Sequence, residues 1–219
     1  MQITVLGHAH ASFSPERATL RMRLGVEGSD KQAALEHTTF LVQGFTTVVE
    51  QLKDMSPSPT SWSSVAPIAT RSWRPWSQDG KVLPTRHAAE CLVKLKFTDF
   101  HALSRFIDQW GGRTGVTVEG VDWTLTEGRR KQEEDNVLAQ AVVQAHARAT
   151  TMARAAGEQS VRFLEIADEG LLAEQQSAAS PKMYGAAMRS GAPPDSEGIT
   201  IAPEDVELDV TVHARFSSD

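Results

Sequence analysis

The chain has 219 residues and a formal net charge of −6, with 40% hydrophobic and 23% charged residues, a composition typical of globular proteins. No apolar run reaches the roughly 18 residues that a membrane-spanning helix needs, which argues against a membrane span. The acidic excess lies in the second half of the chain, and no long basic stripe is present. This charge pattern argues against nucleic acid as the partner.

Two alternating stretches occupy the first thirty residues. Apolar side chains recur at every second position over residues 3–13 and again over residues 18–26. Such alternation predicts two half-buried strands. The short Ser14-Pro15-Glu16 connection predicts that these strands form an antiparallel hairpin.

A long amphipathic helix is expected next. Asp30 is suited to its N-cap, and apolar residues recur at spacings of three and four as far as Leu52. The helix should end near Asp54, before a proline-containing breaker. Residues 60–76 then have a strand-like composition but contain prolines, which predicts an edge strand or an irregular one.

The remaining elements follow from the same kinds of pattern. Asp99 is suited to the N-cap of a short helix. Gly120 falls where the alternation of a strand changes phase, which suggests a bulge. An Ala-rich helix should end at Gly157. The expected elements are strand 86–98, helix 100–110, strand 114–127, helix 129–156, strand 160–168 and strand 204–216.

These elements predict an α+β protein with largely antiparallel sheet, in the order β-β-α-β-β-α-β-α-β-β. We expect a single domain over residues 1–219, with two lobes as a further division. Residues 1–55 and 128–219 would form the main lobe, and residues 60–127 the smaller one. Residues 171–198 are rich in Ala, Ser, Gly and Pro, which predicts a mobile loop. Its apolar residues are either an anchor for a partner, sites of oxidation, or incidental: Met183, Tyr184 and Met188.

Three motifs resemble the SIMPL-domain family, a group of bacterial proteins of poorly defined function. They are the N-terminal stretch ITVLGHAHASFSPERATLRMRLGVEG, the helix LAQAVVQAHARATTMARAAG and the terminal strand IAPEDVELDVTVHARF. The first motif departs from the family pattern at His8, Ala9 and Glu16. Together the motifs cover both ends and the centre of the chain.

The resemblance implies an α+β protomer that assembles into large rings or channel-like oligomers. Members of the family include an oxidative-stress defence protein and a periplasmic immunogen, so a link to stress protection is also implied. The family carries no agreed catalytic residues. Because the first strand begins within two residues of Met1, with no basic or apolar leader before it, we expect a cytoplasmic location.

Three histidines are candidate metal ligands. His8 and His10 lie two apart on one strand, so their side chains point the same way, and His213 lies on the last strand. The competing interpretation places all three on a solvated or packed sheet face beside Arg21, Arg23, Glu207 and Asp209, where the nearby arginines would oppose a cation. The competing interpretation is favoured, and no metal or other cofactor is expected.

The same polar faces also suggest ion pairs. Arg21 and Arg23 would face Glu207 and Asp209 if the second strand and the last strand are neighbours. Such pairs would stabilise the sheet or mediate contact between protomers. We favour the structural interpretation over a ligand-binding one.

An aromatic and basic segment has the most unusual composition in the chain. Its residues are Trp62, Arg71, Trp73, Arg74 and Trp76. Tryptophan and arginine favour protein interfaces, and they also stack on nucleotides or cations. Because the whole chain is acidic, we favour an interface with other copies of the protein or with a partner, and keep a ligand platform as the alternative.

No signature of an established enzyme class is found, including the phosphate-binding loops and the nucleophile elbow. Cys91 is the single cysteine and lies in an alternating run, which favours a buried thiol over a redox sensor. The sequence therefore predicts a non-enzymatic, oligomer-forming protein of the SIMPL type. The alternative is a small-ligand-binding module or an uncharacterised enzyme with a pocket near Trp73, Arg74 and Trp76.

Overall fold

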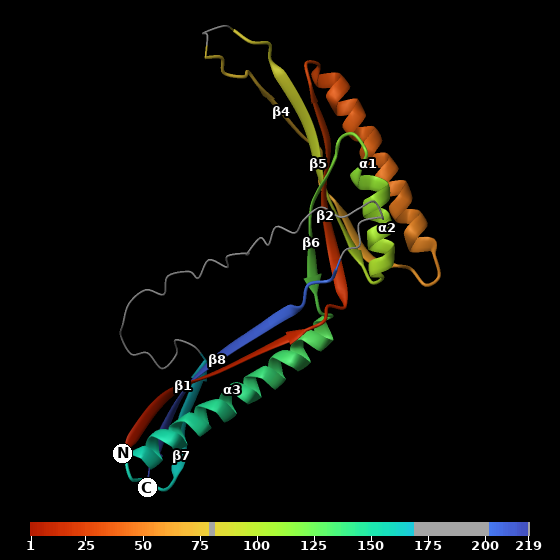
Figure 1. Cartoon of the computed structure of the whole chain (residues 1–219). Helices are drawn as coiled ribbons and strands as arrows, with labels where there is room; N and C mark the ends of the chain where they lie inside the picture. Colours follow the sequence, from red (N-terminus) through yellow and green to blue (C-terminus); the bar gives the residue numbers. More distant parts are fainter. Residues whose placement is uncertain (79–81, 169–201, 219) are drawn as a thin grey trace, which may run out of the picture. The chain divides into compact units, whose positions relative to one another are not determined.

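The structure, a computed structural model, describes residues 1–78, 82–168 and 202–218. These residues form three helices and eight strands, and the strands make up two antiparallel sheets (Figure 1). In chain order the elements are β1 (Gln2–Phe13), β2 (Arg17–Gly28), α1 (Lys31–Asp54), β3 (Thr60–Val65), β4 (Ala69–Trp73), β5 (Arg86–Phe97), α2 (Phe100–Gly111), β6 (Val116–Thr124), α3 (Glu127–Ala155), β7 (Val161–Asp168) and β8 (Val206–Ser218).

The predicted α+β class and element order are confirmed. The expected strand at 60–76 consists of two short strands, β3 and β4, on either side of Pro67, because proline cannot donate to a strand ladder. Both strands pair with β5 at the edge of a sheet, as the prolines predicted. The segment predicted as a mobile loop, with Met183, Tyr184 and Met188, lies outside the described residues.

The chain divides into two compact units. Among the described residues, the first unit draws on 1–13, 126–168 and 205–218, and the second on 14–78, 82–125 and 202–204. This division differs from the expected lobes, which placed residues 14–55 with the two ends of the chain. The difference arises because β2 pairs with β5 and β6, and α1 packs on the same sheet.

The predicted hairpin of the first two strands is wrong. β1 pairs with β8 in the first unit, and β2 lies between β5 and β6 in the second. Residues 14–16 connect strands of two different sheets, and the Glu16 amide donates to the Thr124 carbonyl instead of closing a turn. Alternation shows which face of a strand is buried but does not identify the strand beside it.

In the first unit, α3 covers one face of the three-stranded sheet β1-β8-β7 (Figure 1). The helix can lie close to the sheet because its inner residues are small: Val137, Ala141, Ala145, Ala149 and Ala153. Gly7 on β1 fits against this row, since a Cβ atom there would collide with the Ala141 carbonyl and lie 2.7 Å from the Ala145 Cβ. Gly157, with φ of 91°, ends the helix as predicted.

In the second unit, α1 and α2 cover one face of the sheet β3-β5-β2-β6, with β4 also paired to β5. Asp30 and Asp99 cap these helices as predicted, and each carboxylate accepts two backbone N–H bonds. The core combines the inner residues of β2 and β5 with aromatic rings from the helices, among them Phe45, Phe106 and Trp110. The register of β2 and β6 shifts at Gly120, which confirms the predicted bulge.

Candidate functional site

His8 and His10 lie on the face of the first unit's sheet that α3 leaves open. Both contact one carboxylate, since Asp209 of β8 lies 3.2 Å from His8 Nδ1 and 3.5 Å from His10 Nδ1. The three side chains are about half exposed, at 57%, 46% and 56%. The prediction that the two histidines share a face is confirmed, and Asp209, which the competing interpretation placed on that face, is the carboxylate that both contact.

His213 occupies the same face of β8, opposite Leu6 of β1. In the described part of the chain, no group of three or more His, Cys, Asp or Glu residues has an arrangement that could hold a metal ion. The two imidazoles and Asp209 therefore form a half-exposed polar cluster on a sheet surface.

The predicted pairing of Arg21 and Arg23 with Glu207 and Asp209 is wrong. β2 and β8 belong to different sheets, so these side chains are not neighbours in one sheet. Arg21 instead contacts Asp122 of β6, with 3.1 Å between Nε and Oδ2. Local strand partners, and not the last strand, supply the countercharges.

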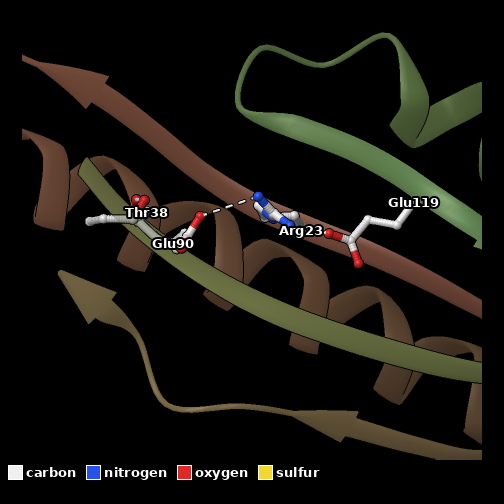
Figure 2. A network of polar contacts seen from close by, with 5 residues as sticks. Arg23, Thr38, Glu90 and Glu119 are labelled. Carbon is white, nitrogen blue, oxygen red and sulfur yellow. Dashed lines mark hydrogen bonds and ion pairs between the residues drawn. The ribbon is translucent and has the colours of Figure 1, made fainter. Parts of the chain in front are cut away.

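Arg23 lies between two carboxylates on the open face of the second unit's sheet. Its guanidinium is 3.6 Å from Glu90 of β5 and also bonds Glu119 of β6, so three neighbouring strands meet at one arginine (Figure 2). On the face of the sheet that α1 covers, the Thr38 hydroxyl donates to the Ala89 carbonyl of β5 at 3.0 Å. The network fixes strand positions and leaves the Arg23 charge neutralised within the chain.

The aromatic and basic residues predicted to act together are separated along β5. Trp62 lies beside Lys96, whereas Trp73 lies beside Arg86. Ten residues of extended strand correspond to roughly 33 Å, so Trp62 does not join the other members. Its ring instead meets the Lys96 ammonium, 5.8 Å from the ring centroid.

The remaining members form one segment, residues 71–76, in and directly after β4. The Arg71 guanidinium stacks on the Trp73 ring at 4.5 Å, and Arg74 is exposed. Trp76 is 80% exposed, the highest value for any large hydrophobic side chain among the described residues. We call residues 71–76 the Trp/Arg segment.

A cavity lies between α1 and α2, away from the Trp/Arg segment. It holds about 650 Å³, with Val48, Leu52 and Phe106 among its apolar walls and Arg105 and Gln109 as polar groups from α2. Arg105 and Gln109 are four residues apart and therefore share a helix face. No sequence pattern indicated this cavity, because polar residues at that spacing are ordinary on a helix surface.

Cys91 is buried in the core of the second unit, as predicted, with 1% of its surface exposed. Desolvation by burial raises the pKa of its thiol, which donates a hydrogen bond to the Ala66 carbonyl. A protonated, buried thiol is a poor nucleophile. The geometry therefore favours a structural role for this residue.

These features define an α+β protein built from two antiparallel sheets. One face of the first sheet is covered by α3, and one face of the second by α1 and α2. The chain belongs to the SIMPL family of proteins of unknown function (DUF541), which matches it over residues 3–216. The resemblance predicted from the three motifs is thereby confirmed. No curated protein matches the chain. None of the described helices combines the length and apolar character needed to cross a membrane.

Proposed function

We propose that this protein acts through self-association, without catalysis, and contributes to stress protection. The observation that carries the proposal is the Trp/Arg segment. It presents an exposed Trp76 beside the stacked Arg71–Trp73 pair at a sheet edge. Tryptophan and arginine are the residues that most often dominate interface energetics. The second basis of the proposal is the assembly and the link to stress protection that the resemblance to SIMPL proteins implies.

The test is light scattering coupled to size exclusion over a range of protein concentrations and at two salt levels. We expect a discrete assembly in the native protein. Trp73→Ala and Arg74→Ala should weaken it, whereas Trp62→Ala, at the far end of β5, serves as the matched control and should not. A native protein that is monomeric at every concentration would overturn the proposal.

Stress protection is tested in cells. We expect cells that lack the protein to be more sensitive to peroxide than cells that contain it. Reintroducing the native gene should restore resistance, and reintroducing a Trp73→Ala form should restore it less well if assembly is required. Equal sensitivity with and without the protein would contradict this part of the proposal.

The alternative function is a small-ligand-binding module or an uncharacterised enzyme. The observation that favours it is the cavity between α1 and α2, which Trp73, Arg74 and Trp76 do not line. The cavity between α1 and α2 would accept an apolar molecule that carries an anionic or hydrogen-bonding group near Arg105. A metabolite screen by thermal shift tests it, because a ligand that binds only the folded state raises the melting temperature. The shift should disappear in Arg105→Ala and persist in Arg113→Ala, an arginine outside the cavity.

A further inference from the structure

β1 forms a long free edge of the first unit's sheet. Its register with β8 runs unbroken from Gln2–Ser217 to Phe13–Val206, and no other described strand pairs with it. Met1 and Ser218 exchange both backbone hydrogen bonds, at 2.9 and 3.3 Å. Because bonded and non-bonded pairs alternate in an antiparallel ladder, the odd-numbered residues of β1 bond β8. The amides and carbonyls of the even-numbered residues, from Gln2 to Ser12, therefore point to the free edge.

The other sheet edges among the described residues carry features that discourage pairing. At β7 the register breaks between Phe163 and Glu165, and the strand carries charged side chains. At β6 the register breaks beside Gly120, next to Glu119. The edge formed by β3 and β4 is interrupted around Pro67.

β1 has none of these features. Over its 12 residues it contains no Lys, Arg, Asp, Glu or Pro and no bulge. His8 and His10 already contact Asp209 of the same chain. Leu6 remains 46% exposed near the middle of the strand. An unbroken edge of this length without Lys, Arg, Asp or Glu is a template for another strand.

We propose that β1 pairs antiparallel with β1 of a second copy, joining two three-stranded sheets into one six-stranded sheet. The inference rests on the proposed self-association and identifies one of its surfaces. β1 itself carries no Lys, Arg, Asp or Glu that would select a charged peptide, and a second copy brings the same sequence without repulsion between such groups of the two strands. A two-fold axis also matches every outward amide with an outward carbonyl.

The register of the proposed β1–β1 pair follows from which residues of β1, odd-numbered or even-numbered, lie on each face of the sheet. Opposed residues in an antiparallel pair share a face, so even-numbered residues must meet even-numbered ones if both α3 helices are to lie on the same side. Pairing centred on Gly7 uses residues 2–12 and sets Leu6 opposite the partner's His8. A hollow of about 370 Å³ beside the strand, lined in part by Leu6, Arg148 and Met152, leaves space for the partner's side chains.

The experiment compares two lysine variants of the full chain by analytical ultracentrifugation over a concentration series. Leu6 and Leu164 have the same side chain and nearly the same exposure, 46% and 47%, but lie on opposite edges of one sheet. Leu6→Lys places two like charges near the proposed axis and should raise the dissociation constant of the assembly about tenfold or more. Leu164→Lys should leave it within about twofold.

Hydrogen exchange provides a second readout. We expect the Thr4, Leu6, His8 and His10 amides to become protected as concentration rises, while the Ile3 and Val5 amides are protected throughout. If Leu6→Lys does not fold, His8→Pro removes an outward amide that β8 does not use and should have the same effect.

Three results would overturn the pairing. An assembly equally stable in Leu6→Lys and Leu164→Lys would place self-association on another surface and leave the proposed function intact. Protection of the even-numbered amides that does not depend on concentration would show that the edge is covered within one chain. A native protein that never associates would overturn both the pairing and the proposed function.

Discussion

The Thr38 hydroxyl donates a 3.0 Å hydrogen bond to the Ala89 carbonyl, which ties the N-terminal half of α1 to β5. Both residues are buried, at 0% and 1% exposure. We expect Thr38→Val to lower the free energy of unfolding by about 0.5–1.5 kcal/mol, because a buried hydrogen bond is lost. Thr46→Val is the control, since its exposed hydroxyl bonds only within α1 and its loss should cost less than about 0.5 kcal/mol. Urea unfolding of both variants measures the difference, and equal losses would contradict the role assigned to Thr38.

Gly7 leaves no space for a side chain between β1 and α3. A Cβ atom there would collide with the Ala141 carbonyl, which belongs to a helix backbone and cannot easily move. We expect Gly7→Ala to lower the free energy of unfolding by about 1–3 kcal/mol or more. Gly128→Ala, in α3 with no atom within 4 Å, should instead stabilise by about 1 kcal/mol. Denaturant unfolding gives both values, and a neutral Gly7→Ala would mean that α3 lies farther from the sheet.

Arg23 contributes to stability mainly through charge. Its side chain is 50% exposed, and those of Glu90 and Glu119 are 35% and 28% exposed. Solvent screens pairs of this kind, so Arg23→Gln should cost no more than about 1 kcal/mol. Molar salt should reduce the loss. Arg215→Gln, which removes a single contact to Glu165, is the comparison and should cost less. Thermal melts at low and high salt would show whether the loss is instead independent of salt.

Cys91 should make the stability of the second unit sensitive to alkaline pH. Burial raises the pKa of the thiol, so the folded chain holds this proton more tightly than the unfolded chain. Its contribution is fully present below the thiol's unfolded pKa, about 8.5, and is lost as pH rises through the folded pKa. Urea unfolding at a series of alkaline pH values should show a steeper decline for the native protein than for Cys91→Ala. Parallel curves would contradict the effect of burial.

Local patterns predicted the elements well. The caps at Asp30 and Asp99, the bulge at Gly120 and the helix end at Gly157 each depend on the chemistry of a few neighbouring residues. The match of motifs at both ends and the centre predicted the family for the same reason.

Strand partners could not be predicted in this way. Alternation in β1 and β2 shows which side chains face a core, but the partner of β1 lies about two hundred residues away. The contact of Asp209 with His8 and the separation of Trp62 from Trp73 both depend on that pairing information. The cavity between α1 and α2 depends on how two helices lie on one sheet, which neither helix encodes alone.

The pairing of β1 with β8 also sets the order in which the chain can fold during synthesis. Residues 14–125 contain all the helices and strands of the second unit, so that unit can fold while the ribosome is still translating the rest. The first unit has β8 as its central strand and cannot be completed until that strand emerges. During this interval β1 has no strand partner, because β8 has not yet been synthesised. In the nascent chain, β1 therefore exposes unpaired backbone groups on both edges, and a chaperone that binds it would prevent aggregation.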